Sequence, residues 1–117
     1  MCVGEGDTSG IIAALEFVVA QVKSRGRPSV VTMSLGGPCE TDDCSQDSLV
    51  MAVEALVKKS IFVSVAAGND GANACFGSPN AAPSAFVTGA FDKNDDMTYW
   101  SNFGECVNIF APYEQLT

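Results

Sequence analysis

Asn69 is the polar residue best placed to take part in chemistry, because it stands just beyond the end of an apolar segment. Residues 61–67 are mostly small or apolar and end at Gly68, and a second such segment, residues 30–35, ends at Gly36 and Gly37. Two strands that end in glycine turns can form a site at the edge of a sheet. The sequence contains no histidine, so hydrolytic chemistry here would need a general base from elsewhere. Taken alone, Asn69 after Gly68 is also typical of an ordinary turn.

The segment before the first of these strands has the periodicity of an amphipathic helix. Its apolar residues recur at steps of three and four between Ile11 and Lys23, which predicts one buried helical face. Thr8 or Ser9 is expected to cap this helix, and Gly26 is expected to end it.

A second helix is predicted after the polar loop that follows Gly37. Ser45 is the expected cap, with Asp47 in the first turn. The predicted buried stripe of this helix consists of Leu49, Val53 and Leu56.

The alternation of strands and helices predicts an α/β fold with a parallel sheet. Residues 30–35 and 61–67 are expected to be strands buried on both faces, and shorter strands are expected at 86–88 and 107–110. Cys2-Val3 is expected to be the stub of another strand, and the last predicted strand is followed by only seven residues. We therefore expect one layered domain that is incomplete at both ends, with ligands beyond the carboxyl ends of its strands.

Composition narrows the classes of function. The 117 residues carry a net charge of −8, which disfavours nucleic acid and anionic lipid as partners. Hydrophobic residues make up 47% of the chain, which argues against disorder, and no apolar segment is long enough to cross a membrane. Five cysteines in so short a chain favour an oxidising, extracellular compartment.

Four motifs occur in order along the chain: Ser34-Leu35-Gly36-Gly37, residues 65–70 (VAAGND), residues 101–104 (SNFG) and residues 109–112 (IFAP). Together they resemble the middle of subtilisin-family serine peptidases, and the proteinase K and aqualysin-like branch is the most similar. The resemblance implies a partial subtilisin-like peptidase domain over residues 1–117, with a three-layer parallel-sheet fold. It also implies a secreted serine endopeptidase that acts on peptides or proteins.

The resemblance assigns the parts of a substrate site. Two backbone edges would bind the substrate peptide as an added strand, one formed by Gly4, Glu5 and Gly6 and the other by Ser34, Leu35 and Gly36. One wall of the pocket for the side chain before the cleaved bond would be formed by Ala66, Ala67 and Gly68. Without the resemblance, these alanines could simply be tightly packed strand residues.

By the same resemblance, Asn69 is the oxyanion-hole residue, whose amide donates a hydrogen bond to the charge that develops on the carbonyl oxygen. Asp70, next to it, suggests a preference for basic or polar substrate side chains.

The catalytic triad of the family is expected outside this chain. In the family the aspartate and histidine precede this region and the nucleophilic serine, in Gly-Thr-Ser-Met-Ala, follows it. We therefore expect the chain alone not to cut peptides and to need the remaining portions of the same peptidase domain.

The alternative is a noncatalytic relic that binds peptides or proteins. A nucleotide-binding module is disfavoured, because Ser9 replaces the third glycine of its motif and Glu5 and Asp7 would repel a pyrophosphate.

The cysteines are assigned partly by resemblance and partly by spacing. Cys75 and Cys106 match a disulfide of the aqualysin-like branch, and Cys2 matches a cysteine whose partner lies upstream. Cys39 and Cys44 flank a short acidic loop and could bridge locally. Their spacing of four residues also permits a zinc site as the alternative.

Calcium is the one cofactor that the resemblance suggests. Family members bind it between the loop that matches Pro83, Ser84 and Ala85 and an aspartate, but this chain has Asn108 at the aspartate's position, which weakens the site. Asp92, Asn94 and Asp96 imitate the start of a calcium-binding loop, but the later ligands are missing. No metal ligand is assigned from the sequence.

Overall fold

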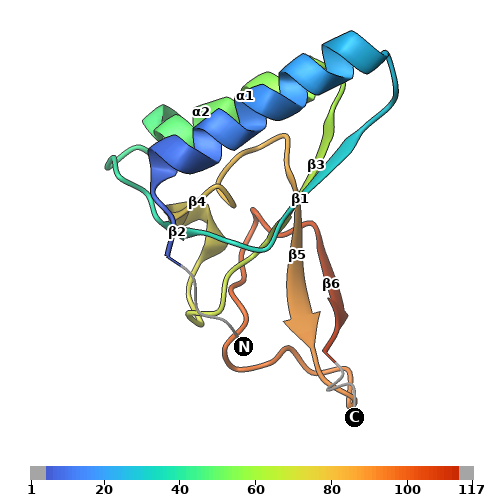
Figure 1. Ribbon diagram of the computed structural model, residues 1–117. Coiled ribbons are helices and arrows are strands. Elements are labelled where there is room, and N and C mark those ends of the chain that lie inside the picture. Colours follow the sequence, from blue (N-terminus) through green and yellow to red (C-terminus); the bar gives the residue numbers. More distant parts are fainter. Residues whose placement is uncertain (1–4, 114–117) are drawn as a thin grey trace.

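The computed structural model describes residues 5–113 as a parallel sheet with two helices packed on it (Figure 1). The sheet has the order β1-β3-β5-β6, and all neighbouring strands are parallel. Its strands are β1 (Val30–Met33), β3 (Phe62–Ala66), β5 (Phe86–Phe91) and β6 (Ile109–Pro112). The predicted α/β class is confirmed, whereas the expected strand stub at Cys2-Val3 lies outside the described residues.

The helices α1 (Thr8–Arg25) and α2 (Ser48–Lys58) lie side by side over the same part of the sheet (Figure 1). The predicted stripe of α2 is confirmed, because Leu49, Val53 and Leu56 are buried. In α1 only Leu15 is buried, so this helix covers the core less completely. The strands contribute Met33, Val63, Val65 and Val87 to the same hydrophobic core.

The other face of the sheet is apolar and exposed. Val30 is 66% exposed and Phe62, its partner in the register, is 52% exposed. Phe86 and Ile109 follow on the same face, and the rings of Phe62 and Phe86 are 5.8 Å apart. The prediction that these strands are buried on both faces is therefore wrong for residues 5–113, in which helices cover one face only.

Aspartates cap both helices, and the predicted caps were wrong. The carboxylate of Asp7 accepts a hydrogen bond from the Gly10 amide at 3.1 Å at the start of α1. The carboxylate of Asp47 caps α2, while Ser45 lies in the preceding short helix η1 (Cys44–Gln46). The predicted end of α1 is confirmed, because Gly26 adopts a left-handed conformation with φ of 63° and its amide donates to the Val22 carbonyl.

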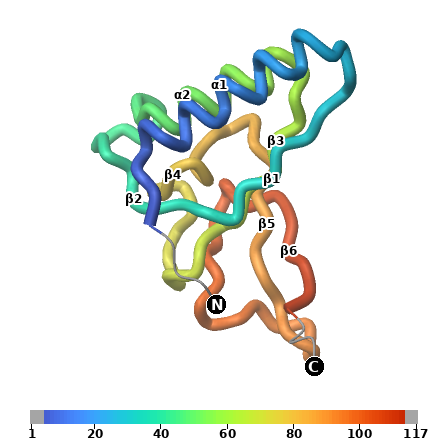
Figure 2. The backbone as a smooth tube through the Cα atoms, viewed as in Figure 1, coloured from blue at the N-terminus to red at the C-terminus, as the bar shows by residue number. Residues whose placement is uncertain are grey.

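A second, two-stranded sheet was not predicted. β2 (Gly37–Pro38) pairs antiparallel with β4 (Gly77–Ser78), which brings the segment after β1 against the segment after β3 (Figure 2). The pairing is too short to leave a periodic pattern in the sequence. It holds the two segments next to each other beyond the carboxyl ends of the parallel strands.

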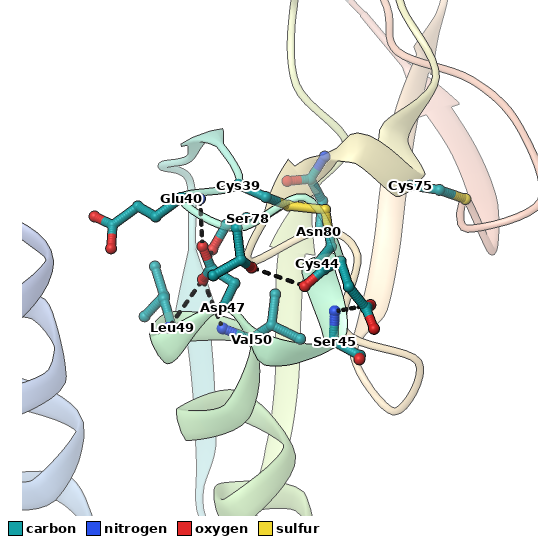
Figure 3. The surroundings of a disulfide bond; sticks show 12 residues. Cys39, Glu40, Cys44, Ser45, Asp47, Leu49, Val50, Cys75, Ser78 and Asn80 are labelled. Carbon is teal, nitrogen blue, oxygen red and sulfur yellow. Dashed lines mark hydrogen bonds between the residues drawn. A yellow bond between two sulfur atoms is a disulfide. The ribbon is translucent and has the colours of Figure 1, made fainter.

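Asp47 ties α2 to this small sheet (Figure 3). Its side chain is 2% exposed. The Ser78 hydroxyl donates to it at 2.6 Å and the Glu40 amide at 2.8 Å, in addition to the two helix amides that it caps. Burial disfavours the charged form, but the hydroxyl of Ser78 and the backbone amides outweigh this effect, so the pKa of Asp47 is lowered.

The variant D47N tests this link. The lowered pKa means that the Asp47 carboxylate stabilises the fold fully above the ordinary value of 3.8, and that this contribution is lost as the pH falls below 3.8. We expect D47N to lower the free energy of unfolding by about 2 kcal/mol at pH 7. This deficit should shrink below about pH 4, where the wild-type carboxylate also becomes neutral.

Urea denaturation followed by circular dichroism at neutral and acid pH measures the effect of D47N. The exposed Asp42 gives a matched control, because D42N should change the stability by less than about 0.5 kcal/mol. Equal stability of D47N and the wild type at pH 7 would contradict the assigned role.

Candidate functional site

A cavity of about 560 Å³ lies where the segments that follow β1 and β3 meet. Its walls come from residues 34–38, from most of residues 66–73, from the segment around β4 and from Asn102. Six residues that the sequence analysis assigned to the substrate site line this one cavity: Ser34, Leu35, Gly36, Ala66, Gly68 and Asn69. The predicted edge at residues 34–36 and the predicted oxyanion-hole residue are therefore brought together.

Three other assigned residues do not line the cavity. Ala67 is buried in the hydrophobic core, so its side chain faces away from the site. Glu5 and Gly6 are exposed and lie outside the cavity lining. Gly4 falls outside the described residues.

Asn69 is presented at the rim of this cavity by a tight turn. Gly68 has a φ of 103°, and a side chain at this position would collide with the amide nitrogen of Asn102. The side chain of Asn69 is exposed and makes no hydrogen bond to another residue in 5–113. Its amide is thus available to a ligand in the cavity.

Asn102 holds the turn that carries Asn69. Its side-chain nitrogen donates to the Ala67 carbonyl at 2.9 Å, and its side-chain oxygen accepts from the amides of Asp70, at 2.9 Å, and Ala72, at 3.1 Å. The Asn102 backbone amide also donates to the Gly68 carbonyl. Hydrogen bonds to Asn102 therefore fix the backbone on both sides of Asn69.

Asn80 supports the same turn from the side of β4. Its side-chain nitrogen donates to the carbonyls of Ala67, at 2.8 Å, and Ala74, at 3.0 Å. Sequence reasoning missed both Asn80 and Asn102 as positioning residues. Asn102 lay within a motif that carried the resemblance, but nothing in the motif indicates its partners, and Asn80 follows a proline in what reads as an ordinary loop.

Two disulfides lie beside the site. Cys75 and Cys106 are bonded, with an S–S distance of 2.04 Å, and connect η2 (Ala74–Phe76) to the segment before β6. Cys39 and Cys44 are also bonded and close the loop that leads from β2 to η1. Because both sulfurs of the Cys39–Cys44 pair are in a disulfide, they cannot serve as zinc thiolates.

The side chains at the suggested calcium sites take part in hydrogen bonds within the protein. The side-chain oxygen of Asn108 accepts a hydrogen bond from the Val87 amide at 2.7 Å, so it serves the sheet and carries no charge. The amide and hydroxyl of Ser84 both donate to the Glu54 carboxylate, which binds the 83–85 loop to α2.

Asp92 caps its own turn by accepting from the amides of Asn94 and Asp96. Across residues 5–113 there is no cluster of three or more His, Cys, Asp and Glu side chains that could hold a metal.

The part of the chain that the structure describes contains no helix that is both long and apolar enough to cross a bilayer.

A family model described as the subtilase family matches residues 3–114. The chain is 43% identical over 110 residues to the subtilase-type proteinase isp6 of Schizosaccharomyces pombe, covering 93% of this chain and 22% of that protein. It is 39% identical over 111 residues to proteinase T of Parengyodontium album, covering 93% of this chain and 36% of that protein. The chain thus spans roughly a fifth to a third of the length of these relatives.

A solved structure agrees with the sequence matches. The crystal structure of a cold-adapted subtilisin-like serine proteinase superimposes with a TM-score of 0.77 at 35% identity, covering 95% of this chain and 37% of that chain. The family match extends over nearly the whole sequence, and the fold matches as well. This chain belongs to the subtilase family.

Proposed function

We propose that this chain is the central part of a secreted subtilisin-like serine endopeptidase. The observation that carries the proposal is the single cavity shared by Ser34, Leu35, Gly36 and Asn69. A peptide bound in extended form along the exposed 34–36 segment would place its cleaved carbonyl near Asn69. The two disulfides support an extracellular location.

In this function Asn69 would act as the oxyanion-hole donor. Its unpaired amide can donate to the oxygen that becomes negative in the transition state, and such a donor works best when it needs no rearrangement. Asn102 supports this role because it fixes the backbone at Asp70 and Ala72, on the far side of Asn69. Asn102 is therefore a positioning residue, since it would act through Asn69 and not on the substrate.

The base and the nucleophile would come from other portions of the same peptidase domain. The 117 residues contain no histidine, and a serine without an activating base is a poor nucleophile. The exposed apolar face formed by Val30, Phe62, Phe86 and Ile109 supports the presence of such portions, because a contiguous apolar surface of this kind usually packs against another part of a protein.

A second candidate function is peptide or protein binding without catalysis. The observation that favours it is that the cavity and the 34–36 segment are formed within a sequence that has no histidine. In that case the segment would still bind an extended peptide, but no bond would be broken.

The complete reading frame and an active-site probe separate the two functions. We expect the reading frame to encode a histidine before this region and a nucleophilic serine after it. A fluorophosphonate should label the complete protein but not the isolated 117-residue chain. A verified full-length transcript that ends at both present termini would remove the endopeptidase assignment, and a labelled isolated chain would contradict the placement of the nucleophile elsewhere.

Replacing Asn69 with alanine in the complete protein tests the oxyanion-hole role. Because the amide would act mainly in the transition state, N69A should lower kcat by about 10²- to 10³-fold and change KM far less. Steady-state kinetics on a peptide substrate measure both. The exposed Asn94 provides a matched control, since N94A should leave kcat unchanged; an unchanged kcat in N69A would refute the role.

A double-mutant cycle tests whether Asn102 acts through Asn69. N102A removes the hydrogen bonds to Ala67, Asp70 and Ala72, and we expect it to lower kcat by at least about tenfold in the wild type. In the N69A background it should have little further effect on kcat, because the group it positions is already absent. Equal effects of N102A in the two backgrounds would show that Asn102 has only a general structural role.

A further inference from the structure

The Asn80 side chain has a fixed orientation at the inner wall of the cavity. It is 5% exposed and lines the cavity. Its amide nitrogen is held by two carbonyl oxygens, those of Ala67 and Ala74. Because the amide oxygen carries no hydrogen to donate to these carbonyls, the side chain cannot be flipped, and Oδ1 must point the other way.

Oδ1 of Asn80 has no donor among residues 5–113, yet it is not sealed from solvent. Every fully buried side-chain nitrogen or oxygen in the described part of the chain has a hydrogen-bond partner, so an unpaired Oδ1 must be reached by solvent. Figure 3 shows the Asn80 amide pointing away from the Asp47 carboxylate. The cavity that Asn80 lines is the open space available to this oxygen.

Two glycines lie close to the Asn80 amide. A Cβ atom at Gly36 would lie 3.7 Å from Oδ1, and one at Gly77 would lie only 2.6 Å from it. Both glycines line the cavity. A side chain at Gly77 would therefore collide with the whole Asn80 amide, because its Cβ would also lie 2.5 Å from the amide nitrogen.

The rest of the lining indicates which ligand suits this acceptor. Leu35, Ala66 and Phe76 give apolar walls, and the carboxylate of Asp70 is a second acceptor on the lining. An apolar ligand that covered Oδ1 would leave it buried without a hydrogen bond, which is unfavourable. A side chain with an apolar stem and an N–H donor at its end satisfies both the walls and the acceptor.

We propose that Asn80 is a specificity-determining residue, and that its Oδ1 selects substrate side chains that end in an N–H donor, such as lysine, arginine and glutamine. The proposal rests on the proposed function, because it assumes that the cavity receives a substrate side chain. A site built to hydrogen-bond a substrate group discriminates strongly against analogues that lack the group. Asp70 would add a preference for cationic over neutral donors.

Matched peptide pairs test the selection. Peptides that differ only at the residue before the cleaved bond carry lysine or norleucine in one pair, and glutamine or methionine in the other. With the complete protein, we expect kcat/KM to favour the donor-bearing member of each pair by at least about tenfold. Equal values within both pairs in the wild type would overturn the proposal.

Three variants assign the effect to Asn80. N80A should reduce the glutamine-to-methionine ratio to within about twofold of one, whereas the lysine-to-norleucine ratio should fall but keep the part that Asp70 contributes. D70N should lower the preference for lysine over glutamine but keep the preference for glutamine over methionine, and N94A should leave all ratios unchanged. A glutamine-to-methionine ratio that persists in N80A would overturn the proposal; if N80A does not fold by circular dichroism, the wild-type pairs decide.

The outcomes separate this proposal from the proposed function. If the complete protein cleaves no peptide, the endopeptidase function fails, and the dissociation constants of the same four peptides then test the selection by Asn80. If it cleaves all four peptides equally, the endopeptidase function stands and the selection fails.

Discussion

The carbonyl of Ala67 is the point on which the site depends. It lies at the end of β3 and accepts hydrogen bonds from two side-chain amides, those of Asn80 and Asn102. The two asparagines come from separate loops, so one buried carbonyl fixes both loops against the turn at Gly68 and Asn69. Buried polar groups that satisfy one another in this way specify a single arrangement, because breaking any contact leaves an unpaired group.

Periodic patterns in the sequence predicted the elements whose burial repeats over a few residues. The stripe Leu49, Val53 and Leu56 and the strand at 61–67 were found because burial repeats at short intervals. The capping residues were missed by one or two positions, since Asp and Ser serve equally well by type and only the backbone decides between Asp47 and Ser45. Asn80 and Asn102 could not be identified as supports, because Asn102 bonds to groups 30–35 residues away in the chain.

The open face of the sheet shows the limit of reasoning from hydrophobicity. An apolar strand predicts that both faces of the sheet are buried, but it does not identify the segments that cover each face. In residues 5–113, α1 and α2 cover one face, while Phe62 and Phe86 on the other contact each other and solvent. The position of the cavity, in contrast, followed from topology, because parallel strands align their carboxyl ends at one edge.

The order of the sheet, β1-β3-β5-β6, is also the order of these strands along the chain. During translation, β3, β5 and β6 can therefore each pair with the strand that was synthesised just before it. The sheet can grow in one direction during translation. The turn that carries Asn69 is synthesised between β3 and β5, whereas Asn102, which holds it, is synthesised only after β5. Three of the four strands of the sheet thus emerge before the residue that holds the turn at Asn69.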